Sequence, residues 1–358
     1  MAQLFGRQMT RAELLRYVGD VSQIAGVRRF VLREGREEGV EAAEFATGTG
    51  FRFTVLVGRG LDISSADYRG MPLAWRSPTG DTHAAYYEPE GLAWLRSFFG
   101  GLVATCGLSS AGAPSTDQGR EFGLHGRIGN TPAYAVWADG EWRGDEYHFW
   151  IQGKMRESIV FGENLVLTRR IEARLGESRL WIYDRVENQA HEPYPLMILY
   201  HINGGYPAVA DGGRLLSATV SVRPRDAEAA EGKEEYAKFH APTPGYKEKV
   251  YYHEIAADAN GFVTTALVND DLGFGFYVKY KKAQLPYFTE WKMMGEGTYV
   301  VGMEPGNCLV EGRAKERERG TLQYIQPGEV REFDLELGVL DSADAIRSLE
   351  EELRALCG

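Results

Sequence analysis

Short apolar segments that end in turn residues fill most of the sequence, and this pattern restricts the chain to a β-rich fold. Segments rich in β-branched and aromatic residues are separated by Gly, Asn, Asp and Pro, which is typical of strands joined by turns. Ten or more such strands with few helices predict an all-β, mainly antiparallel protein, built as a sandwich or a barrel. The expected strands are FRFTVLVG (51–58), YHFWIQGKM (147–155), NLVLTRRIEARL (164–175), RLWIYDRVEN (179–188), PLMILYHI (195–202), FVTTALVN (262–269), FGFYVKY (274–280), TYVVGMEP (298–305), GTLQYIQPG (320–328) and EVREFDLELGVL (329–340).

Two of these segments show the alternation of a strand that buries one face. Phe333, Leu335 and Leu337 alternate with polar residues near the end of the chain. The sequence shows neither βαβ alternation nor a Gly-rich turn between a strand and a helix, so a dinucleotide-binding fold is disfavoured. In the segment 164–175, the apolar residues that alternate and would share the buried face are Leu165, Leu167, Ile171, Ala173 and Leu175.

Helical periodicity is confined to three stretches. The first, about 10–25, begins with Thr10 as a candidate N-cap and Glu13 three residues later. The second lies within 89–103 and the third, about 341–356, closes the chain. We expect one β-sandwich domain over 1–358 with the terminal helices at its edges, and the polar stretch 223–250 as a candidate lid. The apolar residues at helical spacing are Leu92, Leu95 and Phe99, then Ile346, Leu349 and Leu353.

Charge and cysteine content exclude several classes of partner. The formal net charge of −11 disfavours nucleic acid and anionic membranes as partners. Cys106, Cys308 and Cys357 show no CxxC spacing, so neither a disulfide framework nor a zinc site is indicated. The first residues lack the apolar core of a signal peptide, and no apolar run approaches the length of a membrane span. We therefore expect a reduced, soluble, cytoplasmic protein.

Three stretches place a titratable residue beside glycine, proline or asparagine, at or just past the end of a strand. They are FGLHGRIGN (122–130) with His125, LYHINGGYP (199–207) with His201, and VVGMEPGN (300–307) with Glu304. Loops beyond strand ends are where large β scaffolds present working groups. A lone His or Glu in such a place is more often structural than catalytic. The ordered combination carries the functional interpretation.

This combination resembles the aldose 1-epimerase (galactose mutarotase) superfamily, and within it a poorly characterised branch of mutarotase-like proteins. GLHG (123–126) is similar to the first histidine of the family, set in a Gly-containing loop. LYHINGGYP is similar to the second histidine, at a strand end and followed by Asn, and YVVGMEPGN (299–307) to the late strand that carries the base. The resemblance extends from about residue 50 to residue 340 and implies a mutarotase-like supersandwich.

The resemblance also implies a reaction and roles for these residues. Mutarotation interconverts the α and β anomers of a reducing sugar through ring opening, and it requires one base and one acid. By position, Glu304 would take the proton of the anomeric hydroxyl O1 and His201 would protonate the ring oxygen O5. His125 would hydrogen-bond the same ring region, and its flanking glycines would let the backbone approach the ligand. A monosaccharide or sugar derivative is the implied partner, and no metal or organic cofactor is implied.

Further candidates for substrate binding follow from position alone. Arg59 resembles a hydroxyl-binding arginine of the family, and Asn203 follows the second histidine. Trp291 could stack on the sugar while Lys292 binds hydroxyls, although a core Trp and a solvated Lys are as plausible. His253 or Glu254 lies roughly where the substrate-binding aspartate of the family is expected. Arginines 120 and 127 flank His125 and would suit an acidic or phosphorylated sugar.

Two other functions remain open from the sequence. The same sandwich could serve as a non-catalytic carbohydrate-binding module, or as the scaffold of a polysaccharide lyase or hydrolase. Fold analogy cannot separate these from an epimerase, because only the site distinguishes them. The identity of the sugar, its charge and the oligomeric state are likewise left open.

Overall fold

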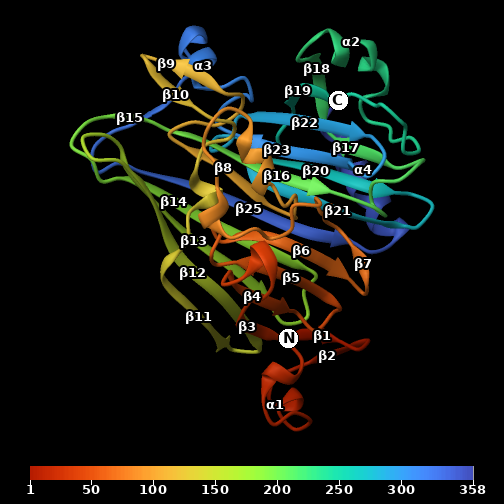
Figure 1. The fold of residues 1–358 in the computed structure, drawn as a ribbon. Helices are drawn as coiled ribbons and strands as arrows, with labels where there is room; N and C mark the ends of the chain where they lie inside the picture. Colours follow the sequence, from red (N-terminus) through yellow and green to blue (C-terminus); the bar gives the residue numbers. More distant parts are fainter. Residues whose placement is uncertain (358) are drawn as a thin grey trace.

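The computed structural model describes residues 1–357 and contains three main antiparallel sheets (Figure 1). The eight-stranded sheet has the order β11 (Tyr134–Arg143), β12 (Glu146–Ser158), β13 (Asn164–Arg174), β14 (Arg179–Asn188), β25 (Val330–Leu340), β21 (Phe274–Lys281), β20 (Phe262–Asn269), β17 (Arg214–Ser217). The six-stranded sheet has the order β18 (Thr219–Pro224), β19 (Lys249–Ile255), β22 (Tyr287–Met294), β23 (Tyr299–Gly306), β16 (Met197–Gly204), β8 (Ala104–Leu108). The five-stranded sheet runs from β3 (Gly26–Val31) through β4 (Glu41–Ala46), β5 (Phe51–Leu56) and β6 (Asp62–Tyr68) to β7 (Met71–Pro72).

Short ladders and helices lie around these sheets. Figure 1 shows the N-terminal hairpin and α1 at one end of the molecule and α2 and α3 at the other. The ladders are β1 (Ala2–Leu4) with β2 (Arg7–Met9), β9 (Ser115–Asp117) with β10 (Arg120–Phe122), and β15 (Tyr194–Pro195) with β24 (Tyr324–Ile325). The α-helices are α1 (Arg11–Leu14), α2 (Ala227–Glu231), α3 (Arg313–Arg319) and α4 (Ala343–Leu356), and the 3₁₀ turns are Val21–Gln23, Gly35–Glu37, Ala84–Tyr86, Ala93–Ser97, Ile128–Asn130 and Lys233–Glu235.

The all-β, mainly antiparallel fold expected from the sequence is confirmed. The C-terminal helix matches its expected range, with Ser342 as the N-cap. The N-terminal stretch forms only the four-residue α1, although Thr10 and Glu13 make the expected capping box. The stretch within 89–103 gives the 3₁₀ turn Ala93–Ser97 instead of a helix. In residues 1–357, none of the helices combines the length and apolar composition that crossing a bilayer requires.

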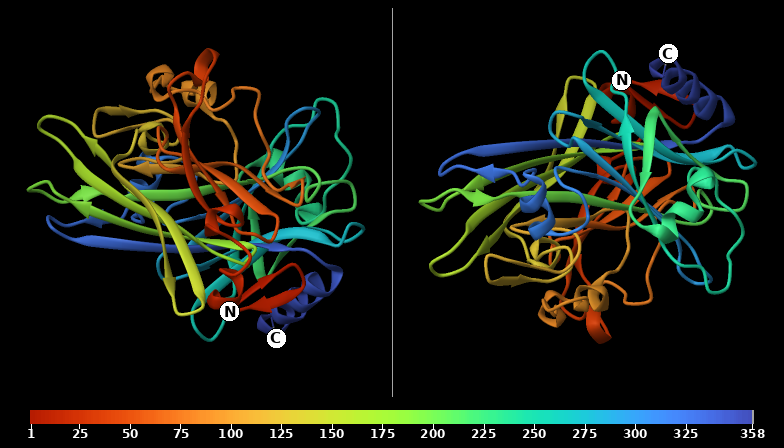
Figure 2. Two further views of the ribbon diagram at one scale, coloured as in Figure 1. Left: turned by 90° about the horizontal axis from the view of Figure 1, so that it is seen from below. Right: turned by 90° about the horizontal axis from the view of Figure 1, so that it is seen from above.

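The three sheets share one apolar core. Phe45 of β4 stacks on Phe149 of β12 with ring centroids 5.8 Å apart, which joins the five-stranded sheet to the eight-stranded one. Figure 2 shows the long strands of the eight-stranded sheet projecting to one side and the segment that carries α2 lying on the other. The sharing of one core fixes the six-stranded sheet relative to its neighbours.

A buried polar network also ties the sheets together. Arg169 of β13 donates to both carboxylate oxygens of Asp184 and, at 2.9 Å, to Asp62 of β6. The hydroxyl of Tyr200 on β16 donates to Asp184 at 2.6 Å, and Thr105 of β8 donates to Asp62. The residue of β16 after Tyr200 is His201, so this network anchors the strand that carries it.

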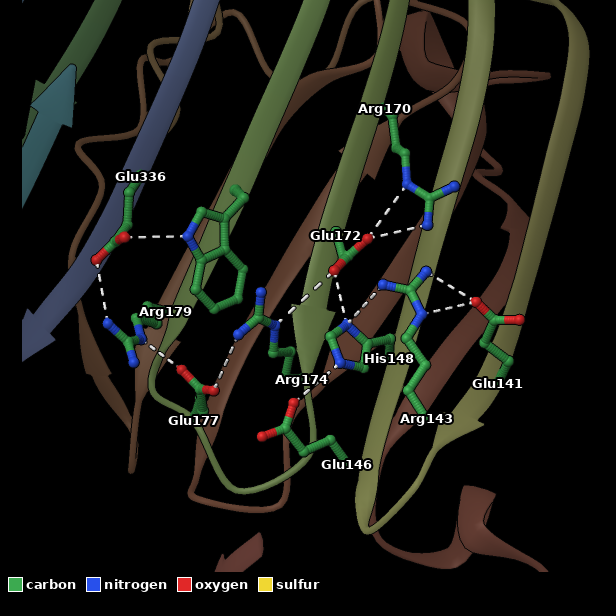
Figure 3. Close-up of polar contacts among 11 residues, drawn as sticks. Glu141, Arg143, Glu146, His148, Arg170, Glu172, Arg174, Glu177, Arg179 and Glu336 are labelled. Atoms are coloured by element: carbon green, nitrogen blue, oxygen red, sulfur yellow. Dashed lines mark hydrogen bonds and ion pairs between the residues drawn. The ribbon is translucent and has the colours of Figure 1, made fainter. Parts of the chain in front are cut away.

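The outer face of the eight-stranded sheet carries a charged ladder instead of apolar residues (Figure 3). Glu172 accepts hydrogen bonds from His148 at 2.8 Å and from Arg170 at 2.9 Å. Trp181 donates to Glu336 at 3.0 Å across β14 and β25. Oppositely charged residues on neighbouring strands pair across this face, and the other face of the sheet packs against the core.

Candidate active site

A cleft of about 500 Å³ opens on the face of the six-stranded sheet that carries His201 and Glu304. This volume lies within the ~300–1,000 Å³ typical of small-molecule sites. Its wall comes from strands β16, β19, β22 and β23 and from the loops around residues 75–79, 92–98 and 113–125. The lining residues are Trp75, Ser77, Pro78, Thr79, Leu92, Trp94, Leu95, Phe98, Ala113, Pro114, Leu124, His125, His201, Arg225, Glu248, Val250, Trp291, Thr298, Glu304 and Val310.

His201 and Glu304 face each other across two hydrogen-bonded strands. The register of β16 and β23 pairs residue 199 with 306 and 202 with 303, which places His201 opposite Glu304. The His201 Nε2 atom lies 3.1 Å from Glu304 Oε1, and both side chains are almost completely buried. Neither Glu304 Oε1 nor His201 Nδ1 has an aligned hydrogen-bond partner within residues 1–357. Both atoms are buried, so a ligand in the cleft reaches them only after a local adjustment of the two side chains.

The surroundings of this pair favour neutral side chains. Burial, and secondarily the charge of Glu248, raise the pKa of Glu304 well above its ordinary value. Burial and the nearby His125 lower the pKa of His201 well below its ordinary value. Since burial penalises a lone charge far more than a compensated pair, the two groups together hold one proton most favourably.

His125 is presented by the loop after β10 and lies beside His201. Their ring centroids are 5.6 Å apart, and burial lowers the pKa of His125 to about 4. Its backbone N–H donates to the carbonyl of Gly112 at 2.8 Å. The glycines near His125 allow close packing of the backbone and do not face a ligand. A Cβ at Gly123 would lie 1.9 Å from the Pro89 carbonyl oxygen, and a Cβ at Gly126 would clash with other backbone carbonyls.

Aromatic rings form the rest of the wall, and most of them escaped the sequence analysis. Phe98 lies 5.2 Å from His201 and stacks on Trp94 with centroids 4.5 Å apart. Trp94 in turn lies 4.7 Å from His125, and Trp75 is 6.0 Å from Phe98. Ring faces of this kind suit the C–H groups of a sugar. The helical spacing within 89–103 predicts a helix and gives no indication that Trp94 and Phe98 line a cleft.

Trp291 lines the cleft, and its orientation is fixed. The indole Nε1–H donates to Glu248 at 2.8 Å, and the ring lies 5.3 Å from that of His201. Glu248 also accepts a hydrogen bond from Arg225 at 3.0 Å. Arg225 and Glu248 come from the two ends of the 223–250 excursion, so this segment borders the cleft.

Gly302 and Thr289 were not identified from the sequence and belong to the same face. A Cβ at Gly302 would lie 2.7 Å from Glu304 Oε1 and 3.2 Å from Trp291 Cβ. The space for the Glu304 carboxyl group therefore depends on glycine at this position. Thr289 is the cross-strand partner of Glu304, and its buried hydroxyl has no hydrogen-bond partner within the described chain. In the sequence, the glycine directly before Met303, Glu304 and Pro305 was the signal that could have identified Gly302 as part of the site.

Arg59 and Asn203, expected to bind substrate, lie away from the cleft. The Arg59 guanidinium is buried and donates to the backbone carbonyls of residues 82, 97 and 129. The Asn203 amide donates to the carbonyls of Gly100 and Gly101. In both residues the side-chain N–H groups donate to backbone carbonyls of loops, and neither side chain lines the cleft.

His253 and Lys292 lie on the opposite face of the six-stranded sheet. His253 contacts Glu290 at 3.2 Å and Thr219 at 3.0 Å. The Lys292 ammonium donates to carbonyls of the excursion, including that of Glu235 at 2.6 Å. Both side chains therefore lie between the reverse face of the sheet and the excursion formed by residues 223–250. Of the charged alternatives, Glu254 pairs with Lys282, Arg120 pairs with Glu163, and Arg127 lies over Tyr87.

A second hollow, of about 660 Å³, lies between the N-terminal hairpin, α1 and β4–β5. It is larger than the cleft, but its wall within residues 1–357 contains no His, Cys, Asp or Glu. Tyr17 and two arginines are its titratable side chains, and it has no carboxylate–imidazole pair, so the cleft is the better candidate for an active site.

Comparison with known proteins agrees with this architecture. The model of a family described as a domain of unknown function, DUF4432, matches residues 37–339. The chain belongs to the DUF4432 family. No protein with a curated description matches this DUF4432 chain significantly.

Solved structures show that this DUF4432 chain has a galactose mutarotase-like fold, as the sequence resemblance implied. A Klebsiella pneumoniae protein provisionally assigned as an aldose 1-epimerase is 26% identical, with a TM-score of 0.89 over 94% of this chain and 91% of that one. A galactose mutarotase-like protein from Clostridium acetobutylicum is 12% identical, with a TM-score of 0.63 over 89% and 99%. Galactose 1-epimerase from Lactobacillus acidophilus is 12% identical, with a TM-score of 0.58 over 89% and 99%.

Proposed function

We propose that this protein is an aldose 1-epimerase-like isomerase that interconverts the anomers of a monosaccharide or sugar derivative in the cleft. The observation that carries the proposal is the 3.1 Å approach of His201 Nε2 to Glu304 Oε1, in an aromatic-lined hollow of about 500 Å³. An acid and a base side by side at a sugar-sized site are what anomer exchange requires. The fold similarity to aldose 1-epimerases supports the same reaction class.

In this mechanism Glu304 and His201 move two protons in opposite directions. The ionised Glu304 removes the proton from O1 while the imidazolium of His201 delivers its proton to O5. The C1–O5 bond breaks, and an open-chain aldehyde forms. Rotation about C1–C2 presents the other face of the carbonyl, and the reverse transfers close the ring. His125 contacts the ring-oxygen side and keeps the sugar in register.

The pair carries one proton before and after each transfer, and this stoichiometry matches its environment. In the empty cleft the proton lies on Glu304, as the raised pKa of Glu304 and the lowered pKa of His201 indicate; it passes to His201 before ring opening and is on Glu304 again after it. Both states are neutral overall, as an ion pair or as two uncharged groups. A buried site tolerates either state at lower cost than a net charge. The 3.1 Å contact is not aligned as a hydrogen bond, so transfer of the proton from Glu304 to His201 requires a reorientation of the two groups.

Two alternatives make different demands on the site. A carbohydrate-binding module needs the aromatic wall but no paired acid and base. A polysaccharide lyase needs a cation that neutralises a uronate carboxylate, and Arg225, the one cation in the described cleft wall, is already paired with two carboxylates. The His201–Glu304 pair therefore favours the isomerase.

Polarimetry of freshly dissolved α-aldoses tests the proposal. We expect the protein to accelerate the approach to anomeric equilibrium for at least one sugar. Glu304→Gln should lower kcat by at least ~10² and leave sugar binding largely intact. Glu290→Gln is the matched control, because Glu290 is a buried glutamate of the same sheet that faces away from the cleft. Sugar binding with no acceleration by the wild type would instead support a binding module.

A further inference from the structure

The wall of the cleft offers no free positive charge to an anionic substrate. Among its described residues Arg225 is the single Lys or Arg, and its guanidinium donates to Asp226 at 2.8 Å and to Glu248 at 3.0 Å. The carboxyl group of Glu304 lies on the same wall. A phosphate or carboxylate in the cleft would meet these acidic groups without a cation of its own, and close like charges disfavour binding. The cleft therefore fits an uncharged sugar.

One end of the cleft is apolar and reaches the surface. Leu92 is 61% exposed and Leu95 is 49% exposed, and both line the cleft. Backbone hydrogen bonds hold the contributing segments together, from residue 124 to 91 and from 113 to 310. We call this end the apolar lip, and it consists of Leu92, Leu95, Pro114, Leu124 and Val310.

The polar groups of the wall come from other segments, which we call the polar part of the wall. Glu248, Arg225 and Trp291 form one hydrogen-bonded cluster beside β19 and β22. Sugar hydroxyls lose water when they bind, and each one requires a new partner to offset that loss. The polar part of the wall can provide such partners, whereas the side chains of the apolar lip contain none. The substituent that faces the lip is therefore the one that needs no hydrogen bond.

The proposed reaction identifies that substituent. Leu124 precedes His125 in the chain, and the Trp94 ring, between Leu92 and Leu95, lies 4.7 Å from the His125 ring. The apolar lip is thus on the His125 side of the cleft. In the proposed mechanism, His201 and His125 contact the ring oxygen O5. In a pyranose, the exocyclic carbon C6 is attached to C5, which is bonded to that oxygen. This orientation directs C6 toward the apolar lip.

We propose that the preferred substrate is an uncharged aldose whose C6 is a methyl group, a 6-deoxyaldose. This inference rests on the proposed epimerase function, because it takes the orientation of the sugar from the reacting atoms. A methyl group gains binding free energy when it is buried against an apolar surface. A hydroxymethyl group in the same place loses its hydrogen bonds to water. Differences of this size in an apolar pocket change kcat/KM by roughly 10- to 200-fold.

Sugars with one ring configuration that differ only at C6 test the proposal. Galactose, 6-deoxygalactose, galacturonic acid and galactose 6-phosphate form one such set, and the corresponding glucose derivatives form a second. We expect kcat/KM to be about tenfold or more higher for the 6-deoxy sugar than for its parent in at least one set. We expect no measurable turnover of the two anionic sugars. A parent sugar that equals or exceeds its 6-deoxy form in both sets, or efficient turnover of a phosphate, would overturn the proposal.

Binding separates this proposal from the function on which it rests. Trp75, Trp94 and Trp291 line the cleft, so their fluorescence reports sugar binding without turnover. Tighter binding of the 6-deoxy sugar with no acceleration of mutarotation would refute the epimerase and uphold the C6 preference. Acceleration without the preference would do the reverse, and absence of both binding and turnover would refute both.

A double variant locates the preference at the apolar lip. Leu92→Ser with Leu95→Ser replaces two exposed leucines, so the fold should tolerate the change. The ratio of kcat/KM for the 6-deoxy sugar to that for the parent should fall toward one, while the anionic sugars stay inactive. Leu272→Ser is the control, because Leu272 is 55% exposed and does not line the cleft. An unchanged ratio in the double variant would contradict the assigned orientation.

Discussion

Replacing Glu304 by glutamine should remove activity and at the same time stabilise the protein at alkaline pH. Burial raises the pKa of Glu304 well above the ordinary value of 4.5. Between the pKa of the unfolded chain and that of the folded protein, the folded state holds a proton that the unfolded state has lost. The free energy of unfolding must then fall as pH rises through this interval. Glu304→Gln cannot ionise, so this loss disappears in the variant.

The expected shift in Tm can be worked out from the binding of one proton and from the entropy of unfolding, which scales with chain length. The slope is at most about 1.4 kcal/mol per pH unit for one proton. The entropy of unfolding near Tm is about 0.75 kcal/mol/K for 358 residues. The Tm of the variant should therefore rise relative to that of the wild type by up to about 2 °C per pH unit. Above pH 7 histidines are neutral in the unfolded chain, so the difference reports the one proton held by the Glu304–His201 pair.

Thermal and denaturant unfolding at several pH values between 7 and 8.5 would measure this difference. We expect the two stability curves to diverge with rising pH until the pKa of folded Glu304 is passed, and then to run parallel. The kcat of the variant in mutarotation should be lower by at least ~10² at every pH. Curves that run parallel from pH 7 upward would mean that Glu304 is already ionised in the folded protein. The assignment of a raised pKa, and the one-proton pair with it, would then be wrong.

Three further changes test the supports of the site. Gly302→Ala places a Cβ 2.7 Å from Glu304 Oε1, so we expect at least ~10-fold lower kcat, whereas Gly19→Ala, where the added Cβ meets no atom within 4 Å, should have normal kcat. Arg169→Met leaves two buried aspartates without their cation and should lower the free energy of unfolding by ~3–5 kcal/mol in denaturant titrations. Burial alone would raise the pKa of Glu172, but hydrogen bonds from His148 and Arg170 (Figure 3) outweigh burial and lower this pKa. The difference in unfolding free energy between the wild type and Glu172→Gln should therefore be largest above pH 5 and shrink as pH falls through 4.

The sequence was sufficient for the fold because each strand carries its own signal. The segments around Leu165 and Leu335 alternate with period 2, and both became strands of the eight-stranded sheet. Arg169 shows the limit of that signal. It occupies a core-facing parity between Leu167 and Ile171, and its burial depends on Asp62 and Asp184, which are distant in the chain. No local pattern indicates such a partner.

The helix expected within 89–103 was wrong for a related reason. Leu92, Leu95 and Phe99 have helical spacing, but the segment is held by loop contacts and forms only the turn Ala93–Ser97. Phe99 is buried, whereas the two leucines face the mouth of the cleft. An apolar stripe reports that a segment avoids water on one side. It does not report whether the apolar neighbour is the core of the protein or a ligand.

For the candidate site, strand geometry could have narrowed the set of residues further than it did. Trp291 and Lys292 were both expected to face the sugar, yet adjacent residues of a strand point to opposite sides of the sheet. Once Trp291 is placed in the cleft beside Glu248, Lys292 must face the excursion, where its ammonium meets backbone carbonyls. His253 shares that reverse face with Glu290. Parity also explains Gly302: it is two residues before Glu304 on the same face, and a side chain there would occupy the position of the carboxyl group on which the proposed chemistry depends.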